Sequence, residues 1–268
     1  MAKPLLPQWA QVPTPVIGMV HLLALPGAPR FGGDPGQIER AMLRDAEALI
    51  EGGVHGLMLE NFGDVPFYPG RVPAAVVSHI TVMALKLRQR WPDLPLGINL
   101  LRNDGRGALA IAHAVGAQFI RVNVLCGARV TDQGIIRGIA HQLLRDRAAW
   151  QADVRIFADV NVKHSAPLGD RPSHQEVDDV IHRGLADAVI VTGSGTGQTV
   201  DHAELSATNG AAGDTPVIMG SGVTADSAAS YAGIADAFII GTAFKHDGVS
   251  SAPVDRQRVQ TFMRRLSQ

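Results

Sequence analysis

Short, continuously apolar runs recur along the 268-residue chain, one about every thirty residues. The eight runs are Val16–Val20, Gly56–Leu59, Leu96–Asn99, Phe119–Asn123, Ile156–Val160, Ala188–Thr192, Val217–Gly220 and Ala237–Gly241. Their apolar residues are consecutive rather than alternate, which is typical of parallel strands that are buried on both faces. The pattern therefore predicts eight buried strands.

The segments between these runs carry helix start and stop signals. The predicted N-cap residues are Asp34, Asp104, Asp132, Asp201, Thr224 and Asp255, Pro73 opens the second helix, and Ser173 with Glu176 forms a capping box for the fifth. After Asp132, residues Ile135, Ile139 and Leu143 would form the apolar stripe of a fourth helix. Strands therefore alternate with helices along the whole chain.

A strand–helix repeat of this length, eight times over and without a linker, favours a closed (β/α)₈ TIM barrel of eight parallel strands. We expect one domain over residues 1–268, with residues 1–15 as a proline-rich N-terminal extension. An open, doubly wound sheet is the alternative. Such a sheet usually has a glycine-rich fingerprint after its first strand, and the loop His21–Gly27 does not contain one.

The strongest chemical signal is a pair of glycine loops after the last two strands. One reads Gly220-Ser-Gly-Val223 and the other contains Gly241-Thr242. In barrels, phosphate sites are often built from these two loops, since glycine lets backbone N–H groups approach an anion. A third loop after the sixth strand adds candidate donors or a lid. The predicted phosphate-binding residues are Gly193, Ser194, Gly195, Gly220, Ser221, Gly222, Val223, Gly241 and Thr242.

Polar residues stand at the ends of the first five strands, where barrel active sites lie. The candidate catalytic residues are His21, Glu60, Asp159, Lys163 and His164, and the candidate substrate-binding residues are Asn61, Asn99, Arg121, Asn123 and Asn161. If the fifth strand extends far enough, Asp159, Asn161 and Lys163 share one face of it. The sequence thus predicts a single polar pocket opposite the glycine loops.

Several kinds of chemistry are open to these groups. Glu60 and Asp159 can serve as a paired acid and base or as ligands of a divalent metal such as Mg²⁺, and no other cofactor is indicated. Lys163, if desolvated, can form a Schiff base with a carbonyl substrate. His21 and His164 can carry protons at neutral pH. The plain alternative is that Asp159 only pairs with Arg121.

Composition restricts the class of protein and the cellular location in which this chemistry would occur. Hydrophobic residues make up 46% of the chain and charged residues 18%, so a folded core is expected. The net charge of −1 gives no general attraction to nucleic acid. Cys126 is the single cysteine, which excludes an internal disulfide. The longest apolar stretch, Val16–Leu25, is too short to span a bilayer, and Met1–Pro15 lacks a secretory pattern. We expect a cytoplasmic protein without a transmembrane segment.

Taken together, the strand ends and glycine loops resemble the BtpA/SgcQ family. The segments that carry the resemblance are Val16–Pro29, Glu60–Phe67, Gly97–Asp104, Arg121–Val124, Ala158–His164, Val191–Gly197 and Ile239–Lys245. The resemblance covers nearly the whole chain and implies a barrel of the ribulose-phosphate-binding type. It also implies kinship with a cyanobacterial member associated with photosystem I biogenesis and with a member in a sugar-utilisation gene cluster. Only through this resemblance would peripheral membrane association be expected.

The favoured function is an enzyme acting on a phosphorylated sugar or similar small phosphate ester, by isomerisation, epimerisation or aldol-type cleavage. Its partner would be a small phosphorylated ligand, and a homo-oligomer is expected. The first alternative is a non-catalytic assembly or stability factor for a membrane complex, which predicts an exposed apolar or basic patch. The second alternative is a nucleotide phosphohydrolase, which would need a phosphate cradle other than the Gly-x-x-x-x-Gly-Lys-Ser/Thr loop.

Overall fold

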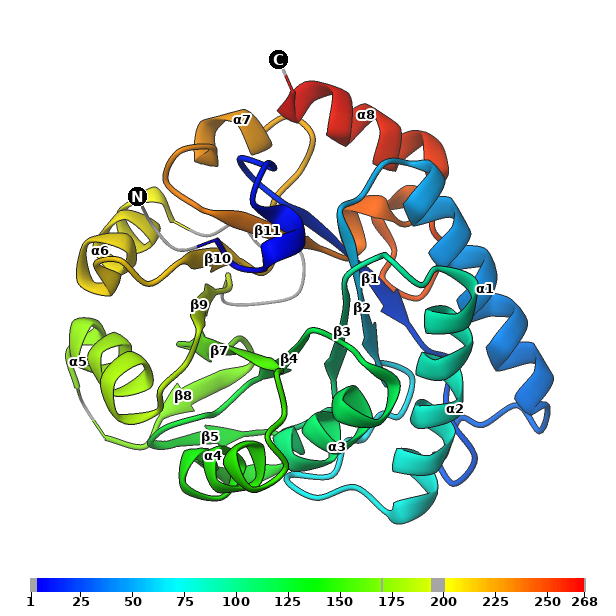
Figure 1. Ribbon diagram of the computed structural model, residues 1–268, viewed down its shortest axis with the longest axis horizontal. Coiled ribbons are helices and arrows are strands. Elements are labelled where there is room, and N and C mark those ends of the chain that lie inside the picture. Colours follow the sequence, from blue (N-terminus) through cyan, green and yellow to red (C-terminus); the bar gives the residue numbers. More distant parts are fainter. Residues whose placement is uncertain (1–3, 170, 194–200, 268) are drawn as a thin grey trace.

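All eight predicted strands form, and they close into a barrel of parallel strands (Figure 1). The computed structural model describes residues 4–169, 171–193 and 201–267. In order around the barrel the strands are β1 (Val16–His21), β11 (Ala237–Ile240), β10 (Val217–Met219), β9 (Ala188–Val191), β7 (Arg155–Val160), β4 (Phe119–Val122), β3 (Leu96–Asn99) and β2 (Gly56–Glu60). The predicted TIM barrel is confirmed, and each strand boundary lies within a residue or two of its prediction.

Side chains alternate between the barrel interior and the surrounding helices. Along β1, Ile17 and Met19 belong to the inner apolar cluster, whereas Val16 and Val20 pack in the larger cluster between strands and helices. Both faces are therefore buried, which is why the strands read as continuous apolar runs rather than alternating ones.

Aromatic side chains fill the end of the barrel opposite the glycine loops. The rings of Phe119 and Phe157 stack with centroids 4.8 Å apart, and Trp9 lies 5.8 Å from Phe119. Gly97 makes room for this packing, because a Cβ there would lie 2.0 Å from the Phe119 ring. Trp9 also donates a hydrogen bond to the His55 carbonyl at 2.8 Å. The proline-rich N-terminal stretch is thus part of the core at this end.

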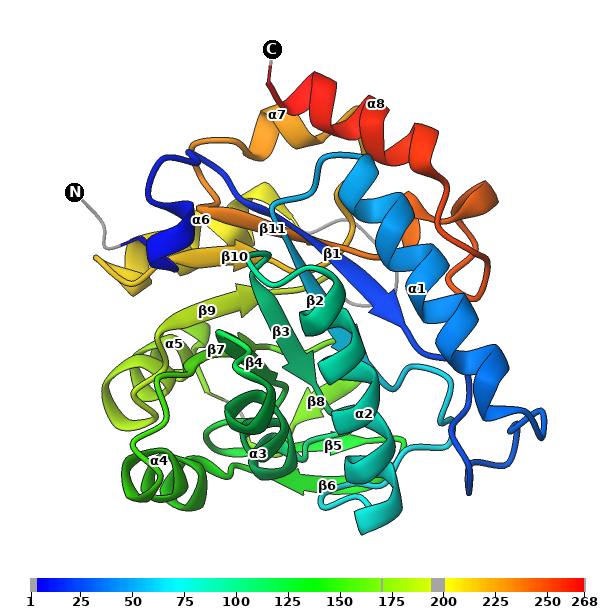
Figure 2. The ribbon, with the colours of Figure 1, turned by 45° about the vertical axis from the view of Figure 1, so that its right-hand side comes forward.

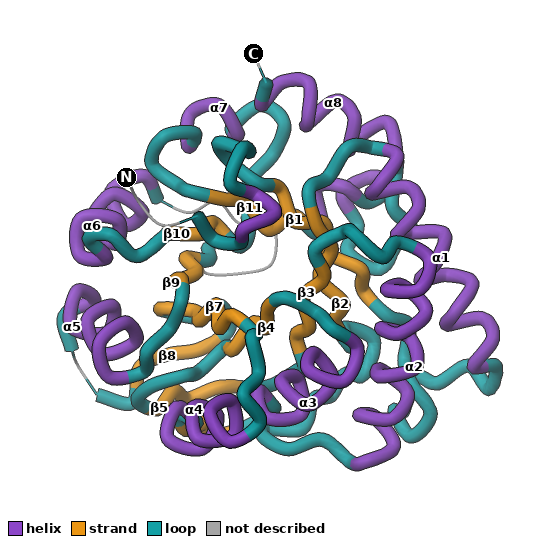
Figure 3. The backbone as a smooth tube through the Cα atoms, in the orientation of Figure 1, coloured by secondary structure: helices purple, strands orange, loops and turns teal. Residues whose placement is uncertain are grey.

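Helices surround the strands on the outside (Figure 3). They are α1 (Pro35–Glu51), α2 (Ala74–Arg90), α3 (Gly105–Val115), α4 (Ala140–Ala149), α5 (Ser173–Asp178), α6 (His202–Ala212), α7 (Ala228–Tyr231) and α8 (Arg256–Leu266). The predicted N-caps of four of them are confirmed, since the carboxylates of Asp34, Asp104, Asp201 and Asp255 each accept a hydrogen bond from a backbone N–H in the first turn.

The prediction for the fourth helix is wrong in its first part. Residues that were expected to follow an Asp132 cap instead form two antiparallel strands, β5 (Ala128–Thr131) and β6 (Gly134–Arg137), with Asp132 in the turn between them. Ile135 is 55% exposed rather than part of a helical stripe. Helix α4 begins only at Ala140. Of the residues expected on its apolar stripe, Leu143 is the one that lies in this helix, and it is buried.

The hairpin belongs to a small sheet at the C-terminal end of the barrel strands (Figure 2). A third strand, β8 (Ser165–Pro167), pairs antiparallel with β5, so the order is β6-β5-β8. Strand β5 follows β4 and strand β8 follows β7 along the chain. The sheet therefore ties together the loops that follow β4 and β7, on one side of the barrel mouth.

Two further capping predictions need correction. Ser173 is the first residue of α5 rather than its cap, and Glu176 accepts hydrogen bonds from Arg129 at 2.9 and 3.1 Å instead of closing a capping box. Thr224 accepts a hydrogen bond from the Ser227 N–H at 3.3 Å. That contact forms a turn, and the short helix α7 begins only at Ala228.

A buried ion pair joins the first helix to the segment after the last strand. Lys245 Nζ donates to Asp45 Oδ2 at 2.8 Å, and the residues are 1% and 5% exposed. The second oxygen of Asp45 accepts from the Val254 N–H at 3.3 Å. Since both oxygens have partners, the ion pair holds α1 against the end of the chain.

Candidate active site

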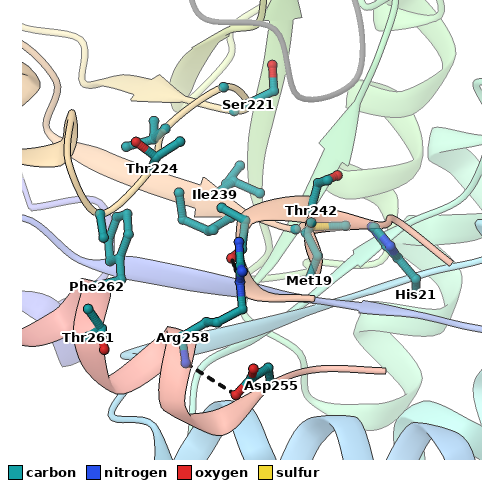
Figure 4. Close-up of a pocket in the computed structure, with 18 of the residues that line it drawn as sticks. Met19, His21, Ser221, Thr224, Ile239, Thr242, Asp255, Arg258, Thr261 and Phe262 are labelled. Carbon is teal, nitrogen blue, oxygen red and sulfur yellow. Dashed lines mark hydrogen bonds between the residues drawn. The ribbon is translucent and has the colours of Figure 1, made fainter. Parts of the chain in front are cut away.

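A cavity of about 680 Å³ opens at the C-terminal ends of the strands (Figure 4). Its walls come from both halves of the barrel. The polar and glycine residues that line it include His21, Glu60, Arg121, Lys163, Gly220, Ser221, Gly222, Gly241, Thr242 and Arg258. The structure thus brings the predicted glycine loops of β10 and β11 together with three of the five candidate catalytic residues.

The glycine loops offer backbone donors to this cavity. Within the described residues, the N–H groups of Ser221, Gly222 and Val223 donate no hydrogen bond. Thr242 opens a 3-10 helix, Thr242–Phe244, so its N–H has no partner in that helix. Gly222 has a φ of +75°, a backbone conformation that glycine adopts without strain. Free N–H groups at a turn and a helix start are the usual elements of an anion site.

The loop after β9 contributes to the same wall where it is described. The Gly193 N–H donates to Ser221 Oγ at 3.0 Å, which ties this loop to the β10 loop. Gly220 packs closely on β9, since a Cβ there would lie 2.5 Å from Ile190. The other two predicted residues of this loop, Ser194 and Gly195, lie outside the described residues.

Arg258 lies beside the glycine loops, although no motif in the sequence marks it as a site residue. Its side chain extends from α8 into the cavity (Figure 4). Its Nε donates to the Ala243 carbonyl at 3.0 Å. That bond leaves the two terminal nitrogens of the guanidinium to bind an anion. The Asp255 cap predicted this helix from the sequence, whereas nothing local showed that Arg258 faces the β11 loop.

Glu60 and His21 stand side by side at the ends of β2 and β1. Asn99 Nδ2 donates to Glu60 Oε2 at 2.5 Å, and His21 Nε2 lies 3.7 Å from Glu60 Oε1. The His21 ring stacks on Phe62 with centroids 4.2 Å apart, and its Nδ1 lies 3.4 Å from the Ser250 carbonyl. Glu60 is thereby held in place while it still lines the cavity.

Burial changes the titration of His21. It lowers the pKa of His21 to about 4, although the nearby Glu60 carboxylate opposes the shift. The positive charges of Lys245 and Lys163 reinforce the effect of burial. At neutral pH the imidazole is therefore uncharged, and it can accept or donate a proton beside Glu60.

Asp159 is enclosed rather than facing the cavity. Arg121 Nη2 donates to Asp159 Oδ1 at 2.9 Å, Arg121 Nε contacts both carboxylate oxygens at 3.2 Å, and Asn123 Nδ2 also donates to Oδ2. The side chains of Arg121 and Asp159 are 3% and 0% exposed. Asp159 therefore forms an ion pair with Arg121. This pairing was the alternative to a catalytic role that the sequence left open. Of this pair, Arg121 lines the cavity.

Lys163 reaches the cavity from the loop after β7. Its N–H donates to Thr192 Oγ1 at 3.1 Å, and its carbonyl accepts from Arg102 Nη2 at 2.7 Å. Burial lowers the pKa of Lys163, and the neighbouring Arg121 lowers it further. The amine therefore loses its proton more readily than an ordinary lysine.

Besides Asp159, Asn99 and Asn123, three more candidates from the sequence do not line the main cavity. Strand β7 ends at Val160 and Asn161 has a φ of +50°, so the expected alternation through Asn161 to Lys163 fails. Asn161 instead accepts from Arg129 at 2.7 Å beside a second cavity of about 500 Å³. Asn61 is 1% exposed and binds the Leu101 backbone, so its contacts are structural. His164 is exposed and is not among the residues that line the main cavity.

The two carboxylates proposed as metal ligands have separate partners. Glu60 contacts Asn99 and His21, whereas Asp159 contacts Arg121 and Asn123. Among the described residues, no three His, Cys, Asp or Glu side chains gather into a group that could hold a metal ion. None of the helices in the described part of the chain combines the length and apolar character that a bilayer span requires.

Solved structures with the same fold include phosphoribosyl anthranilate isomerases. A phosphoribosyl anthranilate isomerase from Thermus thermophilus aligns over 95% of this chain and 98% of its own, with a TM-score of 0.57 and 12% identity. A protein titled KGPDC from Streptococcus mutans aligns over 95% and 97%, with a TM-score of 0.58 and 14% identity. At such identities the likeness concerns the fold alone.

Several other proteins are much more similar to this chain in sequence. The photosystem I biogenesis protein BtpA of Synechocystis is 45% identical over 97% of this chain and 91% of its own. A protein of Thermococcus kodakarensis is 46% identical over 92% of both chains, and a Caenorhabditis elegans protein described as mitochondrial is 32% identical over 94% of this chain and 92% of its own. The family model for BtpA matches residues 12–268. This chain is a member of the BtpA family.

Proposed function

We propose that the protein is an enzyme that acts on a phosphorylated sugar or similar small phosphate ester. The observation that carries the proposal is the composition of one cavity. Unbonded N–H groups and Arg258 line one side, whereas Glu60, His21 and Lys163 line the other. An anion held on the first side would present the rest of the ligand to the ionisable groups. The binding energy of an unreactive phosphate can thus orient the reacting end of the substrate.

The ionisable side of the cavity fits acid–base chemistry next to a carbonyl. Glu60 would move the proton, since Asn99 and His21 fix its orientation. The neutral imidazole of His21 would relay it, and Lys163 would polarise or bind the carbonyl oxygen or carbon. Isomerisation, epimerisation and aldol-type cleavage all need these steps. Asp159 would act through Arg121, whose position it fixes.

The solved structures with the same fold support this class of substrate. Two of them carry the name of a phosphoribosyl anthranilate isomerase, and a phosphoribosyl group fits an anchored phosphate. Their catalytic residues are not transferred to this chain, because the identity is only 12–14%.

The test is a binding and turnover screen of the intact protein. Dihydroxyacetone phosphate, glyceraldehyde 3-phosphate, ribulose 5-phosphate and AMP are compared with their unphosphorylated counterparts, with and without Mg²⁺. A ligand at 100 times its Kd should stabilise the fold by about 2.7 kcal/mol, visible as a rise in Tm. NMR of the incubated mixtures then follows turnover. If neither inorganic phosphate nor any ester raised the Tm, the proposal would be refuted.

A second candidate is a non-catalytic assembly or stability factor for a membrane complex. The name of the Synechocystis relative supports it. So does an exposed apolar pair on the small sheet, where Val130 and Ile135 lie opposite each other and are 41% and 55% exposed. A Glu60→Gln variant separates the two functions. It would abolish turnover by an enzyme, but it would leave the activity of an assembly factor intact.

A further inference from the structure

The chain contains four lysines, and their surroundings differ. Lys86 pairs with Glu39 on the surface, and Lys245 is buried against Asp45. Lys3 lies outside the described residues. Lys163 is the lysine that lines the main cavity, and its amine makes no hydrogen bond or ion pair with a described residue.

The backbone of Lys163 is fixed although its amine is not. Thr192 accepts from its N–H at 3.1 Å and Arg102 donates to its carbonyl at 2.7 Å, so β9 and the loop after β3 hold it from two sides. Arg121 stands on the same wall of the cavity, and its guanidinium is already committed to Asp159. A lysine amine that is desolvated beside another cationic group is the usual environment of a nucleophilic lysine.

We propose that Lys163 forms a covalent imine with the carbonyl carbon of a phosphorylated aldehyde or ketone. This inference rests on the proposed function and narrows its substrate from phosphate esters in general to those with a free carbonyl group. The glycine loops and Arg258 would hold the phosphate, and the carbonyl would reach Lys163 across the same cavity. Burial and Arg121 favour the uncharged amine that the attack requires.

The step balances without an external oxidant or reductant. The neutral Nζ attacks the carbonyl carbon, a C–N bond forms, and one proton moves from the nitrogen to the carbonyl oxygen to give a carbinolamine. A second proton, from the solvent, adds to the hydroxyl group, the C–O bond breaks and the oxygen leaves as water, which yields the protonated imine. Its positive charge withdraws electrons from the adjacent carbon, so a proton there, or a carbon–carbon bond, can be broken. Glu60, on the same cavity wall, would take the proton.

The experiment traps the imine on the wild-type protein. The intact chain is incubated with dihydroxyacetone phosphate or glyceraldehyde 3-phosphate, reduced with sodium borohydride, digested and mapped by mass spectrometry. The expected result is a reduced adduct on Lys163 at least tenfold more abundant than on Lys86 or Lys245. Inorganic phosphate should suppress it, and dihydroxyacetone or glyceraldehyde should give at least tenfold less. Lys163→Arg should lose the adduct, whereas the surface control Lys86→Arg should keep it.

Thermal shift on the same mixtures separates the possible failures. If the esters raise the Tm but no adduct maps to Lys163, the imine is refuted and the proposed function stands. If adducts are spread evenly over the lysines, the imine is also refuted, because surface labelling explains them. If neither the esters nor phosphate bind, the proposed function itself fails. Because mapping uses the wild-type protein, a poorly folded variant does not affect the result.

Discussion

The guanidinium of Arg121 and the carboxylate of Asp159 meet between the neighbouring strands β4 and β7, with N–O distances of 2.9–3.2 Å. Neither side chain is more than 3% exposed. Because the two charges have left water together, each depends on the other for compensation. Removing one partner of such a pair leaves an uncompensated buried charge, which is far more costly than losing an exposed ion pair.

Asp159→Asn is therefore expected to lower the free energy of unfolding by about 3–5 kcal/mol. Urea denaturation measures the change. Asp178→Asn is the matched control, since Asp178 is 66% exposed and should change stability by no more than about 0.5 kcal/mol. Equal stability of the two variants would show that Arg121 finds other compensation. The folded fraction of Asp159→Asn should bind phosphate but lack turnover, and retained turnover would remove Asp159 from the mechanism.

Glu60→Gln should reduce turnover by about 10²–10⁴-fold, the usual contribution of a general acid or base. The amide keeps the size of the side chain, so binding of inorganic phosphate should be unchanged. Steady-state kinetics and calorimetric titration measure the two effects. The control is Glu47→Gln, because Glu47 lies on the surface and pairs with Arg90. If phosphate binding fell as much as turnover, Glu60 would be a structural residue.

Arg258→Ala should weaken phosphate binding by about 10- to 100-fold, since a hydrogen bond to a charged group contributes about 1.5–3 kcal/mol. Isothermal titration with inorganic phosphate measures the loss. Arg256→Ala on the same helix is the matched control, because Arg256 pairs with Glu51 away from the cavity. Equal affinity of the two variants would show that the glycine loops bind phosphate without Arg258.

His21 should make stability depend on pH. Its pKa is about 4 in the folded chain and near 6.5 in the unfolded chain, chiefly because burial disfavours the charged ring. The unfolded state therefore binds more protons between these values. Stability should fall as the pH drops from 6.5 to 4, by on the order of 3 kcal/mol in total, and should be constant above pH 7 as far as this residue is concerned.

The measurement is urea denaturation of the wild type and of His21→Gln at pH 7, 6 and 5. The difference in stability between the two proteins separates the contribution of His21 from those of His55 and His164. The pKa values of these two histidines are also lowered, in both cases chiefly by burial. Parallel pH profiles would show that His21 is solvated in the folded chain.

Local signals were enough to predict the barrel strands and most helix starts. Caps such as Asp34 and Asp255 act within a few residues, so the sequence around them contains the information. Asp132 shows the limit of such reasoning. It precedes apolar residues at helical spacing, yet pairing of β5 with the distant β8 favours a hairpin there, and no local pattern reports that partner.

The sequence pointed to several side chains that line the main cavity, such as Glu60 and Lys163, but not to the orientation of others. Asp159 and Asn161 are two residues apart and were expected on one face, but the left-handed backbone at Asn161 sends its side chain to Arg129. Arg258 enters the site through the packing of α8 beside the β11 loop. Both outcomes depend on contacts between segments far apart in the chain, which periodicity cannot reveal.

The ion pair between Asp45 and Lys245 has a consequence for synthesis of the chain. The two residues are 200 positions apart, and both are buried in the finished barrel. As the ribosome makes the protein, the first helix emerges long before its partner lysine. Until then Arg44, which is largely exposed and donates to Asp45 Oδ1 at 2.9 Å, is the cation that pairs with the Asp45 carboxylate. The buried half of this interaction, from Lys245 to Asp45 Oδ2, therefore forms only when the last unit has left the ribosome, together with the pairing of β1 and β11 that closes the barrel.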